Sequence, residues 1–373
     1  MTGYYQGRFR DQWEALAAEI FADELGLPTV TPRTSLRGDA GPAEFGAGPA
    51  DRIPAGLGAG PAERIAARLG AATGLELTAE LVRRHDTVHA LGGYLRTHAR
   101  RDLCVQLPPD DRGPRPKLFY VHSASGNAFA IWALRSLLPV PLSGVRAAGL
   151  YGEREIPRTV AEFADVYLDE IRDAQPEGPY LLCGFSGGGA IAFELAGRLH
   201  ERGARVGLLA LIDAPAPVFG SVTVQDESTL MEDRLRELLR RVEGRVRDHA
   251  DAGDPEVIDV LRAGDALAKD MGSDALRRQL TVYARLIRAC AAYRPARYPG
   301  EVHYFAAEAT PEHVERWKPY AGALHTYRLD AEHYEYEIFA DPGFREVFAG
   351  LVDDALRRAR TGSPAASGSG ERC

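Results

Sequence analysis

Residues 180–189 read YLLCGFSGGG, and residues 190–199 read AIAFELAGRL. The first stretch is a short apolar run that leads directly into the pattern G-x-S-x-G, centred on Ser186. The second stretch is rich in helix formers and has an apolar face. Gly184 and Gly188 have no side chains, which lets a strand and a helix approach closely at a sharp turn. The sequence here therefore predicts a strand, a tight turn that presents one serine, and a helix.

This arrangement is typical of the nucleophile elbow of the α/β-hydrolase fold, and it makes Ser186 the candidate nucleophile. The N-terminus of the following helix has free N–H groups, which favour a developing negative charge. The alternative is a glycine-rich turn with a structural role only, because G-x-S-x-G also occurs by chance. The strand before it and the helix after it favour the catalytic interpretation.

Asp213 is the candidate acid of a catalytic triad. In this fold the triad follows the chain order Ser, Asp or Glu, then His. The next strand candidate after the elbow is 206–212, and it ends at Asp213. The carboxyl ends of strands in such sheets face the crevice where ligands bind. The alternative is an aspartate that only caps a turn.

His333 is the candidate base among ten histidines. It follows the last strand candidate, 325–329, and precedes a terminal helix predicted at 342–358. That is the position at which this fold supplies its histidine. The alternative is a histidine in a surface loop, with His325 as the base instead.

An oxyanion hole needs two backbone N–H groups. One is expected from Gly187, the residue after the nucleophile. The other is expected from the loop that follows an early strand, predicted here at 117–121. We assign it to Ala124, in the loop 122–127.

Together these segments resemble the type I thioesterases, which are the chain-releasing domains of nonribosomal peptide and polyketide synthases. The resemblance extends from about residue 105 to 360 and rests on VHSASG at 121–126, GFSGGGAIAFE at 184–194, LID at 211–213, and His333. In one departure, Ser123 stands where the family often has proline. The family implies a fatty acyl, polyketide or peptidyl chain that arrives as a phosphopantetheine thioester. The chain passes to the serine and is released to water or to an internal nucleophile.

Residues 1–100 predict a separate helical unit, with helices at 11–25, 62–73 and 80–95, the last broken near Asp86. Between the first two helices, residues 38–60 are rich in glycine, alanine and proline and contain a short repeat, at 46–53 and 58–65. Its first copy, 46–53, predicts a flexible insertion. The unit resembles an acyl or peptidyl carrier domain. This resemblance rests on IFADELGL at 20–27, AATGLEL at 71–77 and DTVHAL at 86–91.

The serine that holds phosphopantetheine in a working carrier is missing. Its G-x-D-S-L motif precedes the second helix, where LGAGPA at 57–62 puts Pro61 at the serine position. A shifted alignment on RGDA at 37–40 puts Ala40 there, and Ser35 lies outside both matches. We therefore expect a pseudo-carrier that docks the thioesterase onto a synthase module, with the substrate on the phosphopantetheine of a separate carrier protein. The alternatives are a degenerate remnant and a helical domain that only looks similar.

Residue composition predicts the organisation of the rest of the chain. Residues 101–116 are charged and contain proline, which predicts a linker to an α/β-hydrolase domain at 117–360. Within that domain, 219–298 is a long insertion with helical patterns, which predicts a lid over the acyl channel. The alternative is a packed extra subdomain. Residues 361–373 are rich in Gly, Ser and Pro, and predict a disordered tail.

The formal net charge of −8 argues against non-specific nucleic-acid binding. No apolar run is long enough for a membrane helix, and the N-terminus does not read as a signal peptide. The four cysteines are scattered without C-x-x-C, which suggests neither a metal site nor a disulfide framework. We therefore expect a cytoplasmic enzyme with no bound cofactor or metal. The rival functions are a carboxylesterase that acts on free esters and a non-catalytic docking protein of a synthase.

Overall fold

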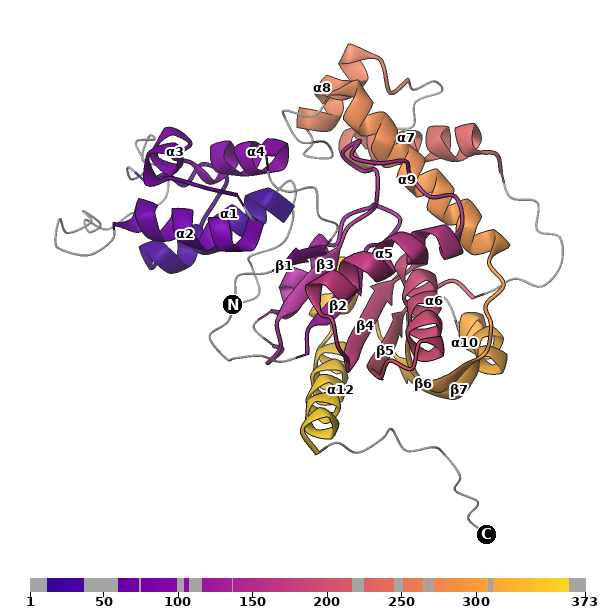
Figure 1. Cartoon of the computed structure of the whole chain (residues 1–373). Helices are drawn as coiled ribbons and strands as arrows, with labels where there is room; N and C mark the ends of the chain where they lie inside the picture. Colours follow the sequence, from indigo (N-terminus) through magenta and orange to yellow (C-terminus); the bar gives the residue numbers. More distant parts are fainter. Residues whose placement is uncertain are drawn as a thin grey trace, which may run out of the picture. The chain divides into compact units, whose positions relative to one another are not determined.

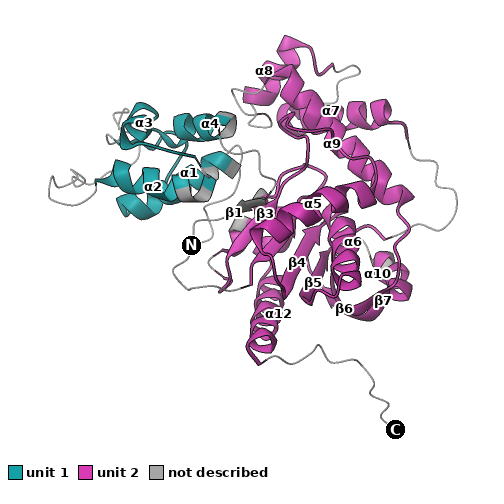
Figure 2. Cartoon of the chain, viewed as in Figure 1, with its two compact units in different colours: residues 1–101, 106–109 teal, residues 102–105, 110–373 magenta. Residues whose placement is uncertain are grey.

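The chain divides into two compact units in the computed structural model. One comprises residues 1–101 and 106–109, and the other residues 102–105 and 110–373 (Figure 2). The structure describes residues 12–36, 60–73, 75–98, 104–106, 116–135, 137–216, 225–244, 251–263, 267, 272–307 and 311–361.

The described residues of the N-terminal unit form four helices (Figure 1): α1 (Gln12–Leu25), α2 (Pro61–Thr73), α3 (Ala79–Arg84) and α4 (Val88–His98). Their apolar faces meet in one core, which includes Leu16, Ile20, Phe21, Ile65, Leu69, Leu91 and Leu95. The predicted break near Asp86 is confirmed by the gap between α3 and α4. The predicted insertion at 46–53 lies outside the described residues.

The second unit is built on a seven-stranded sheet with the order β1-β3-β2-β4-β5-β6-β7. Its strands are β1 (Cys104–Gln106), β2 (Leu118–Val121), β3 (Leu142–Val145), β4 (Tyr180–Phe185), β5 (Val206–Ile212), β6 (Tyr298–Ala306) and β7 (Ala321–Arg328). The pairs from β3 across to β7 are all parallel. Parallel sheets are covered on both faces, and every residue of β2, β3 and β4 is accordingly buried.

Two of these strands were not predicted from the sequence. The stretch that we expected to be linker, 101–116, contains β1, because the apolar run Leu103, Cys104 and Val105 interrupts its charged residues. The strand β3 reads LSGV, which is too short and too poor in apolar residues to stand out as a periodic pattern.

Helices cover both faces of the sheet, as the α/β class requires. On one face, α5 (Val160–Ala174) and α6 (Gly187–Glu201) pack against the sheet and form the main core with it. On the other face lie α11 (Glu335–Ala340) and α12 (Pro342–Thr361), with the 3-10 helix η1 (Phe129–Leu134) against α11. A further helix, α10 (Pro311–Trp317), and a 3-10 turn, η2 (Lys318–Tyr320), connect β6 to β7.

The insertion between β5 and β6 is helical and contains α7 (Glu227–Glu243), α8 (Pro255–Ala263) and α9 (Ser273–Ala292) (Figure 1). These helices share an apolar cluster of their own. The first half of α9 contributes Leu276 and Leu280 to this cluster, whereas its second half buries Val282 and Leu286 in the main core. The helix α9 therefore belongs both to the insertion and to the body of the hydrolase unit.

Candidate active site

Ser186 occupies the turn between β4 and α6, with φ 52° and ψ −128°. A positive φ is unfavourable for a residue other than glycine, so the surrounding structure must hold it in place. The Ser186 N–H donates to the carbonyl of Ile212 at 2.9 Å, and the Ser186 carbonyl accepts from the N–H of Gly189 at 2.9 Å. The serine thus stands at the carboxyl edge of the central strands, beside the end of β5.

The structure brings the three predicted triad residues together. The Nε2 atom of His333 lies 3.2 Å from the Oγ atom of Ser186. The Nδ1 atom of the same ring lies 2.5 Å from Oδ2 of Asp213. A carboxylate only accepts hydrogen bonds, so in the neutral imidazole the Nδ1 of His333 carries the proton and the Nε2 lone pair faces the serine. This is the arrangement in which an imidazole can take a proton from a hydroxyl.

Asp213 is held rigidly and is fully buried. Its N–H donates to the carbonyl of Phe305 at 2.7 Å, and its Oδ1 accepts from the N–H of Ala307 at 3.1 Å. Buried carboxylates need such partners, since an unpaired buried charge is costly. Asp213 also has a positive φ, 45°, which turns its side chain at the end of β5.

His333 lies in the loop between β7 and α11. Its ring stacks on Phe185, with a centroid distance of 4.8 Å, and 45% of its side chain remains exposed. The next residue, Tyr334, lies under the guanidinium of Arg241 from α7 at 5.7 Å. The insertion therefore reaches the histidine loop, while the ring itself remains accessible.

His325, the alternative base, is not in this group. It lies on β7, is exposed, and stacks on His303 of β6 at 5.0 Å. Burial lowers the pKa of His303 to about 4, so that histidine is neutral.

The two predicted oxyanion donors lie on segments that touch. A β-carbon placed on Gly188 would lie 2.3 Å from the carbonyl oxygen of His122, so the loop that carries Ala124 packs directly against the elbow. Across the described ranges, the N–H groups of Ala124 and Gly187 donate no hydrogen bond. Buried N–H groups are nearly always paired, and two unpaired ones beside a serine are suited to bind an oxyanion.

Sequence reasoning missed the side chains that brace this loop. His122 is fully buried; its Nδ1–H donates to the carbonyl of Ser123 at 2.7 Å, and its Nε2 accepts from the hydroxyl of Tyr167 at 2.6 Å. Burial lowers the pKa of His122 to about 4, so it is a neutral structural residue. Next to it, Arg146 and Glu153 form a buried ion pair at 2.8 Å. No spacing in the sequence links these four positions, since the fold alone brings them together.

The helix α9 covers the elbow. A β-carbon on Gly187 would lie 2.9 Å from Cγ of Leu286, and one on Gly126 would lie 3.2 Å from Val282. Both segments that supply the candidate oxyanion donors are therefore in contact with one helix of the insertion.

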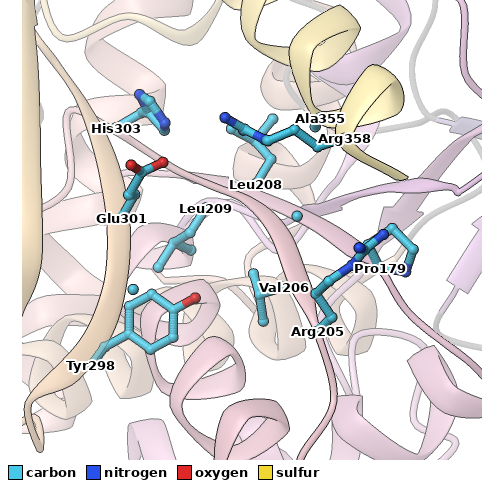
Figure 3. Close-up of a pocket in the computed structure, with 12 residues that line it drawn as sticks. Pro179, Arg205, Val206, Leu208, Leu209, Tyr298, Glu301, His303, Ala355 and Arg358 are labelled. Carbon is cyan, nitrogen blue, oxygen red and sulfur yellow. The ribbon is translucent and has the colours of Figure 1, made fainter. Parts of the chain in front are cut away.

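The pocket in Figure 3 does not belong to this site. It has a volume of about 50 Å³ and is lined by residues such as Val206, Glu301 and Arg358. These lie toward the amino ends of β5 and β6, whereas Ser186 and Asp213 lie at the carboxyl ends of their strands. A larger cavity of about 500 Å³ lies at the carboxyl ends of β6 and β7 and includes Ala307, the hydrogen-bond donor to Asp213. No cluster of side chains suited to a metal ion occurs within the described parts of the chain.

The contacts of the elbow predict that alanine substitutions at two glycines of α6 change the free energy of unfolding in opposite directions. Alanine at Gly188 would place its β-carbon 2.3 Å from a backbone carbonyl, whereas alanine at Gly197 would meet nothing within 4 Å. We expect Gly188→Ala to lower the free energy of unfolding by about 3 kcal/mol or more. Gly197→Ala is expected to raise it by about 0.5–1 kcal/mol. Urea denaturation measures both, and equal stabilities of the two variants would contradict the close approach of the elbow to β2.

Residues 116–337 match the thioesterase domain family. This segment runs from just before β2 through His333 and so contains all three residues of the candidate triad. The chain belongs to the thioesterase family. Its thioesterase domain is similar to those of nonribosomal peptide synthetases, such as the dimodular nonribosomal peptide synthase of Bacillus subtilis, with 27% identity over 274 residues. Enterobactin synthase component F of Escherichia coli O157:H7 is 28% identical over 273 residues.

Each of these two alignments covers 70% of the thioesterase chain. The relatives are far longer, since the alignments cover 11% and 19% of their lengths. The similarity therefore concerns one part of each synthetase.

Solved structures confirm the predicted α/β-hydrolase fold of the thioesterase. A four-domain nonribosomal peptide synthetase, in its holo form with AMP and glycine, superposes with a TM-score of 0.69 and 21% identity. That likeness covers 98% of this chain and 27% of the synthetase. The type II thioesterase BorB from the borrelidin cluster superposes with a TM-score of 0.50 and 20% identity, over 70% of this chain and 100% of its own. None of the helices that the structure describes is long and apolar enough to cross a membrane.

Proposed function

We propose that this thioesterase is a serine enzyme that releases an acyl, polyketide or peptidyl chain from a phosphopantetheine thioester. The observation that carries the proposal is the continuous hydrogen-bonded series from Ser186 through His333 to Asp213. A serine hydroxyl is a weak nucleophile by itself, and an adjacent oriented base is what activates it.

In the acylation step, Oγ of Ser186 attacks the thioester carbonyl carbon while Nε2 of His333 accepts the hydroxyl proton. Asp213 stabilises the imidazolium that forms and keeps the ring oriented. The N–H groups of Ala124 and Gly187 bind the oxyanion of the tetrahedral intermediate. The carbon–sulfur bond then breaks, and the pantetheine sulfur leaves as a thiol with the proton from His333.

In the release step, water or a nucleophile within the chain attacks the acyl-serine ester. His333 again acts as the base, and the oxygen of Ser186 leaves with the proton. Water gives a free acid, and an internal nucleophile gives a ring. The pantetheine arm enters as part of the substrate, so the enzyme itself needs no cofactor for either step.

The direct test of this function compares two leaving groups on the same acyl chain. We expect acyl N-acetylcysteamine thioesters to be cleaved with a kcat/KM at least about 10-fold higher than that of the matched oxygen esters. A fluorophosphonate should label Ser186, which mass spectrometry of the tryptic peptide would identify. Preference for the oxygen ester would favour a carboxylesterase, and an unlabelled Ser186 would favour a non-catalytic docking protein.

For the N-terminal unit we propose the role of a carrier-like docking domain that holds no substrate itself. The helix α2 begins at Pro61, preceded by Gly60, so neither residue at its start has a hydroxyl. The shifted position, Ala40, lies outside the described residues and also lacks a hydroxyl. The substrate then arrives on a separate carrier protein of a synthase module.

Incubation with coenzyme A and a broad-specificity phosphopantetheinyl transferase tests this role. We expect no mass increase of about 340 Da, because attachment of the arm requires a serine hydroxyl. An active carrier protein in the same reaction serves as the positive control. A modified peptide from residues 1–100 would instead make the chain a self-loading carrier and thioesterase.

A further inference from the structure

Tyr120 lies in the middle of β2, next to the centre of the sheet. Side chains alternate between the two faces of a strand, and its neighbours Phe119 and Val121 belong to the core beneath α5 and α6. Tyr120 therefore points to the other face, where its ring meets Phe339 of α11 edge-on at 5.7 Å. The residue is fully buried, so its hydroxyl needs a hydrogen-bond partner inside the protein.

That partner is the carboxyl of Glu335, to which the Tyr120 hydroxyl donates. Glu335 is the first residue of α11, and it follows His333 by only two positions. Glu335 is half-buried. Burial raises the pKa of its carboxyl to about 7, although the Tyr120 hydrogen bond and the charge of His333 act to lower it.

The bond ties the histidine loop to the central sheet. The N–H of Tyr334 donates to the nearby carbonyl of Glu332 at 2.7 Å, and the N–H of Glu332 donates to the side chain of Glu337 at 3.3 Å. Both of these bonds stay within the loop and α11, whereas the bond from Tyr120 reaches β2. The ring of His333 must reach Ser186 and Asp213 at once, so the start of α11 has to stay fixed relative to β2. Small displacements of a catalytic group are costly in rate.

We propose that Tyr120 and Glu335 are positioning residues for the catalytic base, because their hydrogen bond ties the start of α11, two residues after His333, to β2. The inference rests on the proposed function, since it takes His333 as the base of Ser186.

The rate of fluorophosphonate labelling of Ser186 at pH 8 tests the proposal without knowledge of the natural substrate. Tyr120→Phe removes one hydroxyl and should slow labelling about 10-fold, because the start of α11 loses its bond to β2. Glu335→Ala should slow labelling by a similar factor, whereas Glu335→Gln keeps an acceptor for the Tyr120 hydroxyl and should restore labelling to within about threefold of wild type. Tyr180→Phe is the matched control, because it removes a tyrosine hydroxyl that bonds the carbonyls of Gln175 and Pro176 at the amino end of β4, and it should label at the wild-type rate.

A Tyr120→Phe enzyme that labels within about twofold of wild type would overturn the positioning role. Should that variant fail to fold, the two Glu335 variants decide, and equal labelling rates of Glu335→Ala and Glu335→Gln would overturn the proposal. A wild-type chain that is not labelled at Ser186 is a different result, because it would overturn the proposed function together with this inference.

Discussion

Ser186→Ala is expected to reduce the turnover of acyl thioesters by about 10⁴-fold or more. The reason is that the triad acts as a unit: without the hydroxyl, His333 has no proton to accept and no acyl-enzyme can form. A small residual rate from water attack beside the oxyanion donors is expected, since such donors act without the nucleophile. Steady-state kinetics with an acyl N-acetylcysteamine thioester measure the loss.

Ser228→Ala is the matched control for this experiment. Ser228 is exposed near the start of α7 and bonds only to the side chain of Asp226, so its variant should keep wild-type turnover. Retention of most activity in Ser186→Ala would exclude the serine mechanism.

His333→Ala is expected to cause a comparable loss, again about 10⁴-fold, whereas His325→Ala should stay within about threefold of wild type. The structure gives the reason for the contrast. His333 bonds to both Ser186 and Asp213, while His325 is an exposed residue of β7 that stacks on His303. Kinetics and fluorophosphonate labelling of the two variants provide the measurement. A larger loss in His325→Ala than in His333→Ala would show that the base is His325, on β7, and that the assignment to His333, after β7, is wrong.

The elbow and the strands around it were predictable because their signal is local. The run before Ser186 is apolar over the length of a buried strand. The glycines of the G-x-S-x-G pattern indicate that β4 and α6 are in close contact, because a side chain at these positions would clash with backbone atoms. The position of Asp213 beside His333 could be predicted for a related reason, since this fold orders its triad along the chain and β5 is a clear apolar run that ends before Asp213.

Other features could not be predicted because the sequence carries no local mark of them. The strand β3 is four residues long and recognisable only from its pairing with β2. The brace of His122 on Tyr167 joins residues 45 positions apart, and the bond from Tyr120 to Glu335 joins residues 215 positions apart. Burial of polar groups of this kind is decided by tertiary packing, and neither periodicity nor spacing reports it.

The shared position of α9 constrains how this enzyme can be re-engineered. Its first half carries Leu276 and Leu280 of the insertion cluster, and its second half presses Leu286 against the turn of the nucleophile. A chimera that exchanges the whole insertion for that of another thioesterase would replace the packing behind Gly187 as well. An exchange that stops at Leu280 would alter the apolar cluster of the insertion and retain the native packing behind the turn at Ser186. The boundary between the interchangeable and the fixed parts of this domain therefore runs through the middle of one helix.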